Sequence, residues 1–162
     1  MAAGPPLALR QAATGLAAEA AGLKPDLSAV HDARVAIVSC RSYGTKVRPA
    51  LQQAFDLLGG VGALVRNKTA TVKLNLTGTD FAPVFGRPVG ESVMTHFSTA
   101  LALAALLLEA GAKRVRFVES TTSLDSLEKT LGLGGWDVNA LQALSRVDFE
   151  NTRNLGLGKK YS

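Results

Sequence analysis

The chain has 162 residues, of which 47% are hydrophobic and 19% charged, a composition typical of one globular domain with a sizeable core. Its single cysteine, Cys40, excludes a disulfide framework and an iron–sulfur cluster built from this chain alone. The formal charge of +5 permits anionic partners. However, no basic run exceeds two residues and aromatic residues make up only 6%, which argues against nucleic-acid binding.

Composition divides the chain into an alanine-rich tail and linker over 1–30, an α/β domain over 31–152 and a polar tail over 153–162. The first segment lacks the basic start and continuous apolar centre of a secretory signal, which predicts a cytoplasmic protein. A missing upstream signal segment would indicate export instead. The longest apolar run, Ala100 to Leu108, is shorter than the roughly 20 residues of a membrane span.

Apolar patterning predicts four short strands, of which the first is a continuous β-branched run typical of a strand covered on both faces. They are Arg34–Ser39, Ala70–Leu76, Val115–Glu119 and Val147–Phe149. Helical spacing predicts four helices between and after them. They are Val47–Leu58, His96–Ala110, Leu124–Leu131 and Val138–Leu144. Gly59-Gly60 is expected to end the first helix, and the stretch 77–94 has no period and is expected to be a long loop.

Polar residues ahead of these helices predict where they begin. Thr95 is expected to cap the second helix, Thr122 and Asp125 have capping-box spacing ahead of the third, and Asp137 precedes the fourth. Strands that alternate with helices indicate right-handed crossovers. The predicted fold class is therefore α/β, a mainly parallel, Rossmann-like open sheet of about four strands with helices on both faces. The polar ending also fits an incomplete domain.

Polar residues at the carboxyl ends of the strands form the candidate site, because open parallel sheets bind ligands there. Lys73 and Asn75 share one face of the second strand, and the helix start at Thr95-His96 adds backbone donors. Together these groups can hold a carboxylate or a phosphate. The alternative is that Lys73 is an exposed charge on an edge strand.

His96 is a candidate general acid/base or metal ligand, with Glu119 or Asp80 as its partner. Glu119 and Ser120 end the third strand, and Glu119 either orients a ligand hydroxyl or pairs with an arginine. The alternative for His96 is a structural role at the helix start, since no second histidine lies at ligand spacing. No dinucleotide, P-loop, serine-hydrolase or zinc-protease motif occurs, so no cofactor is assigned.

Five short motifs occur in an order that resembles the family called domain of unknown function 362, in the N-terminal part of its domain. They are Val35–Tyr43, Phe55–Gly60, Val72–Leu76, Thr95-His96 and Glu109–Val115. The resemblance covers about 34–150 and implies an α/β fold with a site at the strand ends, but no reaction. Leu74 and Phe97 depart from it, because the family commonly has proline there. Asn67 stands where a turn glycine is common.

We therefore expect a protein that binds an anionic small molecule or a metal-bound ligand at the strand ends. The expected ligand-binding residues are Lys73, Asn75, Thr95, His96 and Ser120, and the candidate catalytic or metal-ligating residues are His96 and Glu119. One alternative is a non-catalytic fragment that needs a C-terminal half or a partner, or self-associates through an open sheet edge. A weaker alternative is a basic nucleic-acid-binding module.

Overall fold

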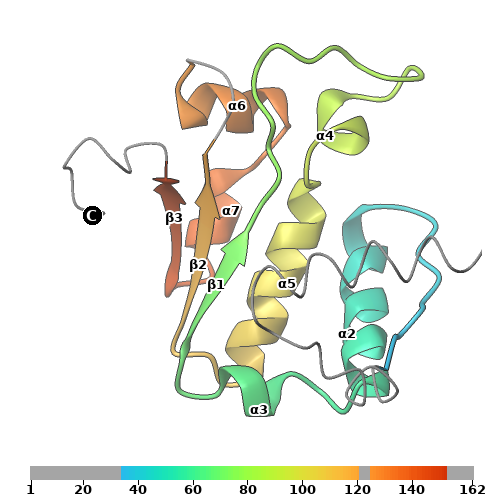
Figure 1. The fold of residues 1–162 in the computed structure, drawn as a ribbon, viewed down its shortest axis with the longest axis vertical. Coiled ribbons are helices and arrows are strands. Elements are labelled where there is room, and N and C mark those ends of the chain that lie inside the picture. Colours follow the sequence, from blue (N-terminus) through green and yellow to red (C-terminus); the bar gives the residue numbers. More distant parts are fainter. Residues whose placement is uncertain (1–33, 121–124, 153–162) are drawn as a thin grey trace, which may run out of the picture. The chain divides into compact units, whose positions relative to one another are not determined.

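The computed structural model of this chain describes residues 34–120 and 125–152 (Figure 1). The chain divides into two compact units, 1–35 and 36–162, and every element below belongs to the second. The predicted N-terminal tail and linker, the C-terminal tail and the cap at Thr122 lie outside the described residues.

A three-stranded parallel sheet lies at the centre of the second unit (Figure 1). Its strands are β1 (Thr69–Lys73), β2 (Arg114–Glu119) and β3 (Val147–Asn151), in the order β1-β2-β3. The register places Thr71 opposite Arg116 and Arg116 opposite Asp148. The predicted α/β class and the open parallel sheet are confirmed.

The helices range from four to thirteen residues. They are α2 (Val47–Leu57), α3 (Gly62–Val65), α4 (Val89–Ser92), α5 (Phe97–Glu109), α6 (Leu127–Leu133) and α7 (Val138–Gln142), with a 3-10 turn η2 (Gly44–Lys46) before α2. Gly59 and Gly60 follow α2 with φ values of 92° and 81°, the left-handed backbone that ends the helix as expected. The stretch 77–94, expected to be a loop throughout, contains α4.

The core lies on one face of the sheet, where α5 and α7 pack (Figure 1). Val115 and Phe117 point from β2 to this face and are fully buried, together with Ala104 of α5 and Leu141 of α7. The opposite face of the sheet is polar. It carries Thr69, Thr71, Arg114, Arg116, Asp148 and Glu150. Side chains alternate between faces along a strand, so the odd and even positions of β2 differ sharply in polarity.

The predicted strand Arg34–Ser39 is wrong, because this segment is extended but forms no strand. Figure 1 shows it beside α2, on the side of that helix away from the sheet. Ala36 and Val38 line a cavity against α2, whereas Ile37 is 89% exposed. Burial thus alternates along a continuous apolar run, so only one face of the segment is covered and not both, and that face packs on α2.

Two helices begin after a different N-cap residue from the one predicted. The N-cap of α5 is His96 and not Thr95, since the His96 side chain accepts a hydrogen bond from Ser98 N. The N-cap of α6 is Ser126, whose hydroxyl accepts from Lys129 N. The cap of α7 is Asp137, as predicted.

Candidate functional site

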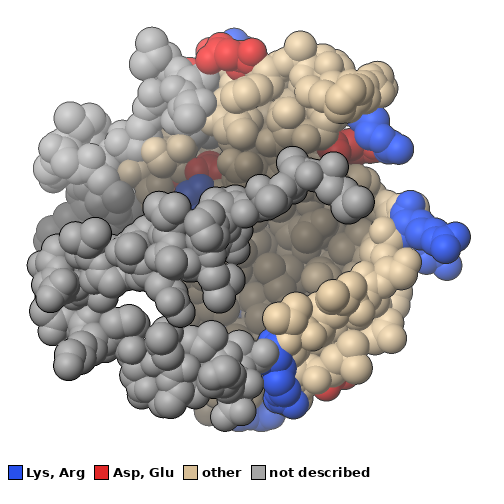
Figure 2. All heavy atoms as spheres, turned by 45° about the vertical axis from the view of Figure 1, so that its right-hand side comes forward, with Lys and Arg blue, Asp and Glu red and all other residues tan. Residues whose placement is uncertain are grey.

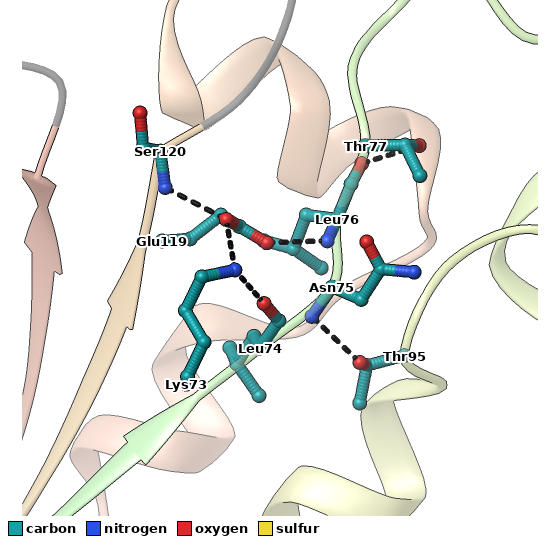
Figure 3. A network of polar contacts seen from close by, with 8 residues as sticks. All are labelled: Lys73, Leu74, Asn75, Leu76, Thr77, Thr95, Glu119 and Ser120. Atoms are coloured by element: carbon teal, nitrogen blue, oxygen red, sulfur yellow. Dashed lines mark hydrogen bonds and ion pairs between the residues drawn. The ribbon is translucent and has the colours of Figure 1, made fainter. Parts of the chain in front are cut away.

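The buried carboxylate of Glu119 is the centre of a polar network at the carboxyl ends of β1 and β2 (Figure 3). Its Oε1 accepts hydrogen bonds from Lys73 Nζ at 2.5 Å and from Ser120 N at 2.7 Å. Its Oε2 accepts from Leu76 N at 2.6 Å. Glu119 is only 3% exposed, so these three donors replace the water that a carboxylate needs. The carboxylate therefore joins the end of β2 to the chain beyond β1.

Lys73 lies at the end of β1 and brings the one cation of this network. Its ammonium donates to Glu119 Oε1 and to the carbonyl oxygen of Leu74 (Figure 3). An ammonium has three N–H donors, so these two bonds leave one for another acceptor. The Lys73 side chain is 62% exposed, and a ligand in solvent can reach this donor. Of the two alternatives for Glu119, pairing with an arginine is wrong, because its partner is a lysine.

Asn75 and Thr95 clamp the chain beyond β1 to the start of α5. Thr95 Oγ1 accepts from Asn75 N at 3.0 Å, and Thr95 N donates to the Asn75 carbonyl oxygen at 2.7 Å. This use of the Thr95 hydroxyl explains why it does not cap α5. The side-chain amide of Asn75 points away from the Glu119 network in Figure 3. Asn75 is exposed, and its amide makes no hydrogen bond to the described residues.

His96 is held in place by the aromatic ring of Tyr43 and by Ser98. Its imidazole stacks on Tyr43 with centroids 3.7 Å apart and planes 8° from parallel. Its Nδ1 lies 2.8 Å from Ser98 Oγ and accepts from Ser98 N at 3.1 Å. Partial burial lowers the pKa of His96 from its usual value, and the charge of Glu91 opposes this only in part. The ring is therefore a neutral cap whose orientation is fixed.

His96 and Glu119 make hydrogen bonds to different partners. Among residues 34–120 and 125–152, no hydrogen bond or ion pair joins them, and no group of three potential metal ligands occurs. Both carboxylate oxygens of Glu119 already accept from N–H donors. The described geometry thus offers an orienting carboxylate and no metal centre.

Tyr43 and Ser98 contribute to the site although neither was a predicted ligand-binding residue. Ser98 Oγ accepts from Gly44 N at 3.1 Å, which ties the turn before α2 to the first turn of α5. The stacking of Tyr43 on His96 joins residues 53 positions apart, as their numbers show, and has no signal in the sequence.

Basic side chains are scattered over the surface. Figure 2 shows Lys and Arg at separate places on one face, with uncharged surface between them. Several arginines are neutralised by acidic partners. The pairs are Arg48–Glu109, Arg87–Glu91, Arg114–Asp148 and Arg116–Glu150. Among the residues that the structure describes, no helix is both long and apolar enough to cross a membrane.

Comparison of the chain with protein-family models, with curated proteins and with solved structures found no match. The resemblance to the domain of unknown function 362 family rests on the five sequence motifs alone.

Proposed function

We propose that this protein binds a small anionic molecule, a carboxylate or a phosphate, at the carboxyl ends of β1 and β2. The observation that carries the proposal is the state of the Lys73 ammonium, which Glu119 and the Leu74 carbonyl orient but do not saturate. A cation held by a buried carboxylate has little freedom to lose when a ligand binds. Its remaining N–H donor is therefore well placed for an incoming oxygen.

Neighbouring groups extend this donor into a recognition surface. Ser120 is exposed at the end of β2, and its backbone N–H shares Glu119 Oε1 with the Lys73 ammonium, whereas the exposed Asn75 amide points away from this network. The thirteen-residue helix α5 begins two residues after the clamp at Thr95, so its dipole favours negative charge there. The negative charge of Glu119 offsets part of this attraction. We expect weak binding, with a Kd of about 1 mM or somewhat below.

The sharpest test titrates the full chain with inorganic phosphate and with citrate and follows backbone amides by NMR. We expect shifts at Asn75, Thr95 and Ser120 that saturate with ligand. Lys73→Met should weaken binding about tenfold, since a charge-assisted hydrogen bond is lost. Lys113→Met is the matched control, because Lys113 is also an exposed lysine but directly precedes β2, at the opposite end of the strands. Equal loss in both variants would contradict the proposal.

A second candidate function is a module completed by a partner strand. Within residues 34–120 and 125–152, β1 and β3 each have an edge that pairs with no strand, and the segment predicted to be a fourth strand lies beside α2. Open edges of this kind expose unpaired backbone N–H and C=O groups, which can pair with a strand of another chain. Sedimentation of the full chain over a range of concentrations tests this. A monomer at all concentrations would count against self-association through the edges.

We also propose a family relationship and a cellular compartment for this protein. We propose kinship with the domain of unknown function 362 family from the order of the five motifs, and a reducing cytoplasmic setting from the single cysteine. Cys40 is an exposed free thiol, which fits that setting. Thiol titration of protein purified without reductant tests the second point, because a fully oxidised thiol would contradict it.

A further inference from the structure

The polar face of the sheet holds a cavity of about 730 Å³, apart from the Lys73–Glu119 network. Parallel sheets are usually covered on both faces by apolar side chains, so polar residues in the middle of all three strands are unusual. The cavity is lined by Thr69, Thr71, Arg114, Arg116, Asp148 and Glu150 of the strands, with apolar groups near β3 and α7. A volume of this size accommodates a small organic ligand.

Glu150 carries a hydrogen-bond acceptor that residues 34–120 and 125–152 leave unused. Its side chain is 9% exposed and lines the cavity, and its Oε2 accepts from the Arg116 guanidinium. Its Oε1 is buried and has no hydrogen-bond partner among the described residues. A buried carboxylate oxygen without a donor is costly, so this atom indicates where a donor from outside the chain belongs.

The charges around this atom restrict the kind of donor. Among the described lining residues, two arginines face two carboxylates, and they form the pairs Arg114–Asp148 and Arg116–Glu150. The site is therefore neutral overall, which disfavours a strongly charged ligand. Thr69 and Thr71 are exposed hydroxyls that both donate and accept. The apolar lining includes Phe149, which faces the core with Phe117, and Val138 of α7, so the cavity extends from the polar face around the edge of the sheet at β3.

We propose that this cavity binds a neutral, hydroxyl-rich small molecule of the sugar class. A sugar hydroxyl donates to Glu150 Oε1, further hydroxyls exchange hydrogen bonds with Thr69 and Thr71, and the C–H face of the ring packs on the apolar lining. This combination of donor, acceptor and apolar surface fits a sugar. A phosphate or a carboxylate would place a second negative charge beside Glu150 and gain nothing at Oε1.

The test uses saturation-transfer NMR on the full chain with glucose, maltose, N-acetylglucosamine and myo-inositol at millimolar concentration. We expect transfer to at least one of them. Thr71→Val should weaken that binding about fivefold through the loss of one hydroxyl, and Thr45→Val, outside the cavity, should leave it unchanged. Glu150→Gln should weaken it about tenfold, because the amide keeps an oxygen for Arg116 and puts an N–H at the position of Oε1.

Glu109→Gln is the matched control for the carboxylate, since Glu109 also pairs with an arginine but does not line this cavity. Circular dichroism and thermal melting show which variants fold, and Thr71→Val decides the question if Glu150→Gln does not fold. Absence of transfer to every sugar in the panel would overturn the proposal. Sugar binding that Thr71→Val leaves unchanged, or phosphate binding in this cavity, would overturn it as well.

Discussion

The ammonium of Lys73 lies 2.5 Å from the buried carboxylate of Glu119, across the ends of two neighbouring parallel strands. The same carboxylate accepts from the backbone of Leu76 and of Ser120. The backbone pairing between β1 and β2 continues to Leu74, whose N–H donates to the Val118 carbonyl oxygen, and at Leu76 the Glu119 side chain supplies the acceptor that a strand would provide. The ion pair is therefore part of the fold and of the proposed site at once.

Glu119→Gln is expected to lower the free energy of unfolding by about 2 kcal/mol, because an amide replaces a buried charged acceptor and turns one N–H toward a donor. Lys73→Met should cost less, about 0.5–1 kcal/mol, since the lysine is mostly exposed and solvent screens its charge. Urea unfolding of both single variants and the double variant measures their coupling. A coupling energy near zero would mean that the pair contributes nothing to stability.

The stability of the protein should depend on the charge state of His96. Burial lowers its pKa below the ordinary value of about 6.5, so the unfolded chain binds the proton more readily than the folded one. The free energy of unfolding should therefore fall as the pH drops through 6.5, until it reaches the folded pKa. His96→Asn keeps a side-chain acceptor at the N-cap and removes the titration.

Thermal melts of the wild type and of His96→Asn between pH 5 and pH 8 test this expectation. The other histidine, His31, is present in both proteins, so the difference between their pH profiles isolates His96. The two proteins should converge in pH dependence above 7 and diverge below 6.5. Parallel profiles over the whole range would contradict the assignment.

Gly90 is expected to tolerate no side chain. It is buried in α4, and a Cβ there would overlap the carbonyl oxygen of Gly134 and lie 2.9 Å from its carbon. Gly90→Ala should lower the free energy of unfolding by about 1–3 kcal/mol, the usual cost of overpacking. Gly132→Ala is the matched control, since a Cβ at this α6 position meets nothing within 4 Å. It should raise stability by about 0.5–1 kcal/mol. Equal effects in urea unfolding would show that α4 does not pack against Gly134.

Three of the four strands were predictable because each alternates apolar and polar residues between turn signals. Val115 and Phe117 fall on one face and Arg114 and Arg116 on the other, as a period of two requires. A continuous β-branched run predicted a further strand at 34–39 covered on both faces, but Ile37 is exposed and the covered side of this segment packs against a helix. Periodicity identifies which face is covered. It does not identify which element covers it.

The site residues were predictable as strand ends, but their bonds were not. Lys73 and Glu119 are 46 positions apart, and only the parallel register of β1 and β2 brings them together. The choice of cap for α5 shows the same limit. Both Thr95 and His96 can cap a helix, and the structure uses His96 because Asn75 N already donates to Thr95. Local sequence patterns identify the residues that can cap a helix or end a strand, and tertiary contacts determine which of them do so and with which partners.

Phe85 lies at the tip of a tight turn in a conformation that suits other residues better. Its φ is 53° and that of Gly86 is 73°, and Arg87 N donates to the Val84 carbonyl oxygen at 3.0 Å. Positive φ at both central positions is typical of a type I′ turn, which favours Asn-Gly. Phe85 is fully exposed, so its ring gains no packing in return.

Phe85→Asn should therefore raise the free energy of unfolding by about 1 kcal/mol, because asparagine adopts the left-handed backbone at lower cost. Phe81→Asn is the matched control, since Phe81 is also exposed in the same segment but has no positive φ. It should have no effect or a slightly destabilising one. Urea unfolding of both variants distinguishes the two outcomes. A loss of stability in Phe85→Asn would mean that the turn is not held in this conformation, and that the aromatic ring stabilises the protein through some other contact.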